Sequence, residues 1–342
     1  MAVVEQLLWP LDRARSSVLR AFGPLLGPWM RSRELRVAWL GTWLVALSLV
    51  GALVLPTWML ALGPIVLGVP HIASDLRYLV ARPGLHLRGW SSLAVLGPLA
   101  AGALTGRLYY GLLATTLAVL VSRATWLHKL AGVALSLGLA ALTWRYQGWS
   151  ELVFAHAHNL VAVLLWWAWR PRSGRGHLLP LGLFALGSVA LLSGALDPLF
   201  AAWGKLAPEL GLSLGGHARQ LAPFAGPEVG LRWVLAFAFA QSVHYTIWLR
   251  LVPEEDRDRE GPRGFASSYR ALAADIGQPL VIATLLGTLF IAGWAVLDLV
   301  AARAGYLRFA VFHGQLELCA GAWLLLEGRL GRGASSPRVA LA

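Results

Sequence analysis

Histidines and carboxylates occur in apolar segments of this chain, where ionisable side chains are rare. His71 and Asp75 lie in the segment GPIVLGVPHIASDLRYLV, and His313 and Glu317 lie in FAVFHGQLELCAGAWLLLE. Each pair is spaced by four residues, which places both side chains on one face of a helix. An ionisable side chain inside a membrane span costs about 2.5–3.5 kcal/mol on insertion scales, so these residues are functional candidates by default.

Two further apolar segments contribute histidines. His156 and His158 lie in ELVFAHAHNLVAVLLWW, and His244 lies in AFAFAQSVHYTIWLRL beside Gln241 and Tyr245. His156 and His158 are about 200° apart on a helix, so only one of them is expected to face a shared centre. We favour His156, because a neighbouring asparagine offers His158 a different polar contact.

The chemistry that suits several neutral imidazoles and a few carboxylates in a dry layer is transition-metal binding. Mixed ligation by histidine and carboxylate favours non-haem Fe(II), and a haem with two axial histidines is the nearest alternative. The carboxylates would bind the metal directly or orient the imidazoles. Tyr245 and Gln241 flank the site and could hydrogen-bond dioxygen there. The candidate metal ligands are His71, His156, His158, His244, His313, Asp75 and Glu317.

The elements that position these residues must be membrane helices. Of the 342 residues, 57% are hydrophobic and only 13% are charged, whereas soluble domains carry about 25% charged residues. Lipid is therefore the expected solvent, and a soluble multidomain protein, a disordered chain and a coiled coil are excluded. The single cysteine, Cys319, excludes an intrachain disulfide and a cysteine-based zinc site.

Apolar runs long enough to cross a bilayer predict an all-α, polytopic membrane bundle of about ten transmembrane helices. The predicted domains are an amphipathic, interfacial segment at 1–36, one transmembrane domain at 37–328 and a tail at 329–342. The predicted spans are 37–55, 57–81, 90–105, 108–122, 126–144, 149–169, 179–199, 229–251, 277–301 and 306–328.

The lysines and arginines orient these spans. With ten spans, 22 of the 29 Lys and Arg residues fall on the side that holds both termini. The positive-inside rule then places both termini in the cytoplasm, as in a bacterial-type inner membrane. The net charge of +12 is thus a topology signal, with anionic headgroups rather than nucleic acid as its partner. The charged segment 253–264 is predicted to be solvated.

The four segments that carry histidines all run from outside to inside in this arrangement. His71, His156, His158, His244 and His313 then lie within about 6 Å of the membrane midplane, at 1.5 Å per residue. Histidines scattered at random would include some at the ends of these spans. The sequence therefore predicts that the imidazoles converge.

The residues Gly68 to Asp75, GVPHIASD, resemble the G-x-P-H-G-x-x-D signature of the Brp/Blh family. These bacterial and archaeal membrane proteins cleave β-carotene with dioxygen to give retinal. The resemblance implies that His71 is an iron ligand. Asp75 matches the aspartate of the same signature. It covers eight residues of the chain. Ile72 replaces the second glycine of the signature, and the family's later H-x-x-x-H pair is missing, so the other ligands would be arranged differently.

Two classes of function fit these features. The first is an iron-dependent membrane oxygenase that acts with dioxygen on a lipophilic, polyene-like or isoprenoid substrate. The second is a transporter or channel that uses the His, Asp and Glu residues as a proton or metal-ion relay. The prolines at 64 and 70 and the glycines at 63 and 68 predict one interrupted helix at the site. A transporter is expected to show several such helices and an internal repeat.

Overall fold

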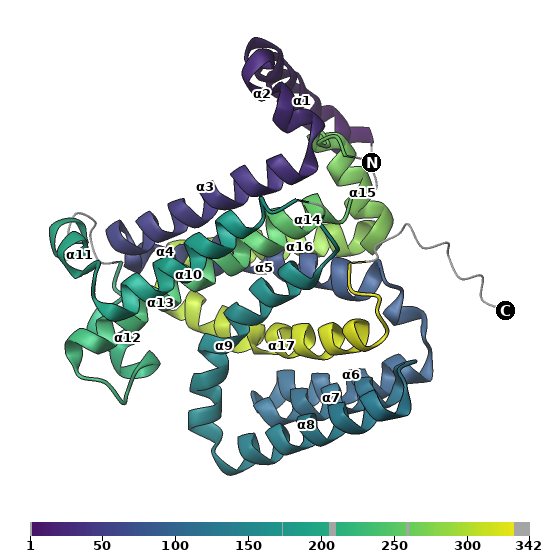
Figure 1. Ribbon diagram of the computed structural model, residues 1–342, viewed down its shortest axis with the longest axis vertical. Coiled ribbons are helices and arrows are strands. Elements are labelled where there is room, and N and C mark those ends of the chain that lie inside the picture. Colours follow the sequence, from purple (N-terminus) through teal and green to yellow (C-terminus); the bar gives the residue numbers. More distant parts are fainter. Residues whose placement is uncertain (1, 173, 205–209, 258–259, 332–342) are drawn as a thin grey trace.

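The chain folds into a bundle of helices, which is the arrangement expected where lipid offers the backbone no hydrogen-bond partners. The computed structural model describes residues 2–172, 174–204, 210–257 and 260–331, and these ranges contain helices but no strand (Figure 1). An all-α class is therefore confirmed. From residue 332 on, the predicted tail lies outside the described residues.

Helices occupy all ten segments that were predicted to be spans. The second segment is a continuous series of four helical pieces, and the eighth changes its helical type before it ends. The helices at these positions are α3 (Arg33–Val54), α4 (Pro56–Leu62) with η1 (Gly63–Leu67), α5 (Gly68–Asp75) and η2 (Leu76–Ala81), α6 (Trp90–Thr105), α7 (Leu108–Val121), α8 (Trp126–Arg145), α9 (Gln147–Ala168), α10 (Leu178–Ser193), α13 (Pro227–Thr246) with η4 (Ile247–Leu251) and α14 (Val252–Glu255), α16 (Gln278–Leu297) and α17 (Leu299–Leu326). Shorter helices at the ends of the bundle are η3 (Leu85–Leu87), α11 (Asp197–Trp203) and α12 (Leu214–Leu221).

Six of these helical stretches are long and apolar enough to cross a membrane. They are α3, the series 56–81, α8, α9, α16 and α17. A seventh is added if α10 and α11 are taken as one span bent by 83°. These helices thus have the length and composition of membrane spans.

Two predicted boundaries are wrong. The span predicted at 179–199 is broken, because α10 ends at Ser193 and is capped by Gly194, whose φ of +83° favours glycine, and the chain then turns into α11. The last two spans, predicted to be separated at 302–305, are instead separated at Asp298. The Asp298 side chain accepts a hydrogen bond from the backbone N–H of Ala301 at 2.9 Å and so begins α17 seven residues earlier than predicted.

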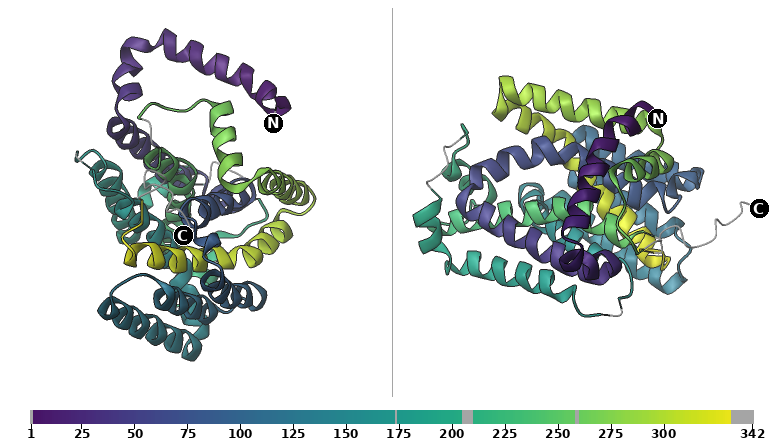
Figure 2. Two further views of the ribbon diagram at one scale, coloured as in Figure 1. Left: turned by 90° about the vertical axis from the view of Figure 1, so that its right-hand side faces the viewer. Right: turned by 90° about the horizontal axis from the view of Figure 1, so that it is seen from above.

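The long helix α17 is the centre of the bundle. It packs against α5, α6, α7, α9 and α16, while α3, α10 and α13 pack together on one side and α6, α7 and α8 on the other (Figures 1 and 2). Glycines allow the closest approach to α17: a methyl group on Gly68 of α5 would lie 2.2 Å from Cζ of Tyr306. The middle of α17 is therefore held tightly among helices from distant parts of the chain.

Residues 254–257 form a buried ion-pair seam, so the prediction that segment 253–264 is solvated is wrong for this part. Glu254 is fully buried and pairs with Arg36 at 2.5 Å and with Arg257 at 2.9 Å. Glu255, 3% exposed, pairs with Arg172 at 2.9 Å. These arginines offset the desolvation of the carboxylates, which keeps the seam buried.

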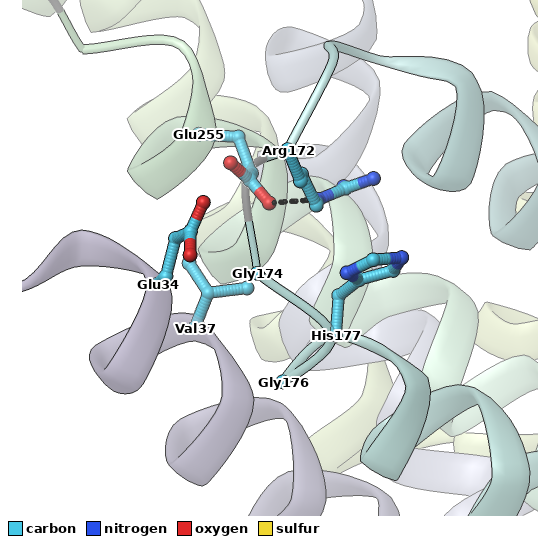
Figure 3. A pocket seen from close by; sticks show the side chains of 7 residues that line it. All are labelled: Glu34, Val37, Arg172, Gly174, Gly176, His177 and Glu255. Atoms are coloured by element: carbon cyan, nitrogen blue, oxygen red, sulfur yellow. Dashed lines mark hydrogen bonds and ion pairs between the residues drawn. The ribbon is translucent and has the colours of Figure 1, made fainter.

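A small cavity lies beside the seam. Figure 3 shows Arg172 reaching Glu255 at its edge, with Glu34 and His177 on the other walls. Its volume of about 10 Å³ is close to the minimum that one water molecule needs. This cavity therefore has no room for a substrate.

The first two helices, α1 (Ala2–Ala21) and α2 (Gly23–Arg31), form an arm on the bundle (Figure 2). Leu7 and Val18 of α1 are exposed, as expected for an amphipathic segment. Asp12 fixes the arm, because its carboxylate accepts the backbone N–H groups of Phe265 and Ala266 at 2.6 and 3.0 Å and caps α15 (Phe265–Ile276).

Candidate metal centre

Four helices bring four imidazole rings together in the interior of the bundle. His71 comes from α5, His158 from α9, His244 from α13 and His313 from α17. The ring of His71 lies 4.5 Å from that of His313 and 5.1 Å from that of His244, centroid to centroid. His158 lies 5.1 Å from His244 and 5.6 Å from His313. The convergence predicted for the helices that carry histidine is therefore present.

A carboxylate joins the closest part of this group. His71, His244, His313 and Glu317 each offer one ligand atom, and these atoms all lie within 4.8 Å of one another. Asp75 is adjacent, with Oδ2 at 3.7 Å from Nε2 of His71. We call the six residues the site cluster: His71, Asp75, His158, His244, His313 and Glu317.

The backbone sets the tautomer of three of the imidazoles. Nδ1 of His71, of His158 and of His313 each contacts the carbonyl oxygen of the residue three positions earlier, at 2.7 Å for His71 and 3.0 Å for His158. A carbonyl oxygen can only accept, so Nδ1 carries the proton in each ring. Nε2 is then left with a lone pair, which is the form in which neutral imidazole binds a metal.

The carboxylates of the cluster have no hydrogen-bond donor among the described residues. Asp75 and Glu317 are fully buried, and all four of their oxygens lack such a partner. Oε1 of Glu317 lies 3.2 Å from Nε2 of His244, and both ring nitrogens of His244 also lack a hydrogen bond. Buried carboxylates that face imidazole lone pairs are costly unless a cation or a proton balances their charge. The donor set therefore fits a metal ion.

The helices are irregular where they present these residues. The π-helical segment η1 precedes His71 by one turn, η2 follows Asp75 directly, and η4 begins three residues after His244. A π-turn rotates the following residues relative to a regular helix and is frequent at functional sites. The interruption predicted from the prolines thus takes the form of π-turns within a continuous helix.

His156 does not belong to the site cluster, and our preference for it over His158 is corrected. Nε2 of His156 bonds to the carbonyl oxygen of Leu221 at 2.9 Å. Its ring packs against Trp233 and Phe237, at centroid distances of 5.0 and 5.5 Å. The rotation of α9 therefore directs His156 towards α12 and α13, and His158 towards the cluster.

The two residues predicted to flank the centre are both buried and close in sequence to His244. Tyr245 is buried, and its ring lies 4.9 Å from that of His71. Gln241 is also buried, one helical turn before His244, and its Oε1 has no hydrogen-bond partner among the described residues. Both are thus placed on the helix that carries His244.

Tyr306 is a residue of this region that the sequence argument missed. It is 2% exposed, it packs over Gly68, and its hydroxyl has no hydrogen-bond partner in the described part of the chain. Its position seven residues before His313, hence on the same face of α17, was the available signal. A tyrosine is common enough in a membrane helix that this spacing alone did not single it out.

Comparison of the chain with protein-family models, curated proteins and solved structures finds no match. A functional assignment therefore depends on the chemistry of the site cluster. The resemblance of Gly68 to Asp75 to the Brp/Blh signature stays an expectation drawn from eight residues.

Proposed function

We propose that this chain is an integral-membrane, non-haem iron oxygenase that acts on a lipophilic, polyene-like or isoprenoid substrate. The observation that carries the proposal is the site cluster, in which unpaired imidazole nitrogens and carboxylate oxygens converge in a buried place. Leaving that many polar atoms unpaired in an apolar interior costs free energy that coordination would remove.

The donor set favours iron among the common metals. Imidazole and carboxylate together are the ligands of non-haem Fe(II) oxygenases, whereas structural zinc sites are commonly rich in cysteine. The charges of Asp75 and Glu317 would balance one divalent ion without leaving net charge in the interior. A haem would need its macrocycle between two axial rings, but the four rings of the cluster contact one another edge to face.

Each residue of the cluster then has a role. His71, His244, His313 and Glu317 would hold the ion, and Asp75 and His158 would complete or orient that set. Bound Fe(II) would supply the one-electron chemistry that dioxygen requires. Tyr245 and Gln241 would offer hydrogen bonds beside the centre, and the surrounding apolar side chains would exclude water, which protects reactive species.

Activity in a bilayer tests this function directly. The protein would be placed in phosphatidylcholine nanodiscs, supplied with Fe(II) and given β-carotene as a probe substrate. We expect dioxygen uptake to accompany loss of the polyene absorbance, and His71→Ala to abolish both. The exposed His86 supplies the control variant His86→Ala, which should stay active. Equal polyene loss in His71→Ala and in the unaltered protein would contradict the proposal.

The membrane topology belongs to the same proposal. We infer ten spans with both termini in the cytoplasm of a bacterial-type inner membrane, supported by the distribution of 22 of 29 basic residues and by helices at all ten predicted positions. Reporter fusions at Arg107, Arg145 and Ala218 should report the outer side. An inner location for two of the three would contradict this topology.

A further inference from the structure

We propose that the metal centre opens sideways into the hydrocarbon of the bilayer, between α9 and α17, and that Phe154 sets the width of this opening. An uncharged, slender lipophilic molecule would approach the metal here. The inference rests on the proposed function, and it adds the route and the residue that selects the substrate.

The first observation is the uneven burial of the site cluster. Four of its members are at most 1% exposed. His158 and His313 are partly exposed, although both lie in the interior of the bundle. The two partly exposed members are neighbours, with ring centroids 5.6 Å apart. The least covered side of the cluster is therefore the flank that α9 and α17 form together.

The second observation is the position of this flank along the helices. His158 lies near the middle of the 22-residue helix α9, and His313 lies near the middle of the 28-residue helix α17. At 1.5 Å per residue, each is at least about 15 Å from the nearer end of its helix. A molecule from water would have to follow that length of apolar helix, whereas a molecule dissolved in hydrocarbon meets the flank directly.

The third observation is the chemistry around the flank. The ring of Phe154 stacks on that of His158, with centroids 5.6 Å apart and planes 26° apart. Phe154 also fills the space opposite Gly314 of α17, where an added methyl group would lie 2.9 Å from Cζ of Phe154. The ring of Phe154 at this contact suits an apolar chain and offers no partner to a charged group.

Phe154 is therefore the side chain that a molecule entering between the two helices would meet first. Gly314 leaves room for the phenyl ring but for little more, so a larger side chain at 154 would close the gap. Val153, the preceding residue, is 63% exposed and lies about 100° away around α9. It supplies a control position with the same depth and a different direction.

The experiment uses the full chain in phosphatidylcholine nanodiscs, loaded with Co(II) in place of iron. The visible d–d absorption of Co(II) reports any molecule that binds to the metal. The probes are 1-decylimidazole, which dissolves in hydrocarbon, and imidazole-4-acetate, which carries a charge. We expect 1-decylimidazole to change the spectrum and imidazole-4-acetate to leave it unchanged. Phe154→Trp should weaken binding of 1-decylimidazole by at least about tenfold, and Val153→Trp should change it less than twofold.

Other results overturn the inference in distinguishable ways. Equal effects of Phe154→Trp and Val153→Trp, or a response to imidazole-4-acetate as strong as that to 1-decylimidazole, would refute a lateral opening while leaving the metal centre intact. A protein that is folded by circular dichroism but takes up no Co(II) would refute the metal centre itself and the opening with it.

Discussion

The two histidines of α9 provide a matched pair of substitutions. His158 faces the site cluster, and His156, two residues earlier, bonds to the carbonyl oxygen of Leu221. Removing a group that ligates or orients a ligand typically weakens metal affinity by about 10- to 100-fold, which is about 1.4–2.7 kcal/mol. His158→Ala should therefore weaken metal binding by that factor.

His156→Ala should act on stability instead. It removes the donor 2.9 Å from the partly buried Leu221 oxygen, and leaving that carbonyl without a partner costs about 1 kcal/mol, the lower end for such groups. The midpoint of thermal unfolding should fall, while the affinity for metal stays within about twofold of that of the unaltered protein.

Competition with a chelator of known affinity measures the first quantity, and a thermal unfolding curve of the metal-free protein measures the second. Weaker metal binding in His156→Ala together with normal binding in His158→Ala would refute the assignment of the two faces of α9. Loss of folding in both variants would be seen in the unfolding curves.

Two further predictions concern packing and charge. Gly68→Ala should lower both stability and metal affinity, because its methyl group would lie 2.2 Å from Tyr306. Gly138→Ala, on the exposed face of α8, meets nothing within 4 Å and should stabilise its helix by about 0.5–1 kcal/mol. Unfolding curves that do not separate the two variants would contradict the packing of α5 on α17. Glu327 lies just beyond α17 and accepts two hydrogen bonds from Arg88, at 2.6 and 2.7 Å. Burial alone raises the pKa of Glu327, but these bonds and the Arg88 charge outweigh it and lower the pKa from 4.5 to about 2. A carboxylate whose pKa is lowered by folding stabilises the fold above its ordinary pKa and loses that contribution as the pH falls towards its folded pKa. The difference in unfolding midpoint between the unaltered protein and Glu327→Gln should therefore shrink from pH 4.5 to pH 2, and a difference that does not depend on pH would count against this ion pair.

The sequence predicted the helical segments well because membrane helices are set by local hydrophobicity. The boundaries at 90–105 and 108–121 differ from prediction by no more than one residue. Asp298 was missed because it sits in a long apolar run, where hydropathy outweighed the N-cap signal of a single aspartate. Boundaries that depend on one capping side chain are thus harder to predict than the runs themselves.

The site was predicted in outline but not in detail. Spacing placed His71 and Asp75 on one face of a helix, but it could not say which face of α9 meets α17. That choice depends on partners such as Leu221, which lies 65 residues beyond His156. The burial of Glu254 likewise depends on Arg36, 218 residues away. Contacts between distant segments fix both features, and such contacts cannot be predicted from a single sequence.

The most direct test of the central claim is the metal content of the detergent-purified protein, measured together with its absorption spectrum. Convergence of the imidazole nitrogens and carboxylates of the site cluster predicts stoichiometric iron without a Soret band, and loss of that iron in His71→Ala but not in His86→Ala. A Soret band would show a haem in place of the non-haem centre. Absence of any bound transition metal after expression with added iron would contradict the metal centre altogether.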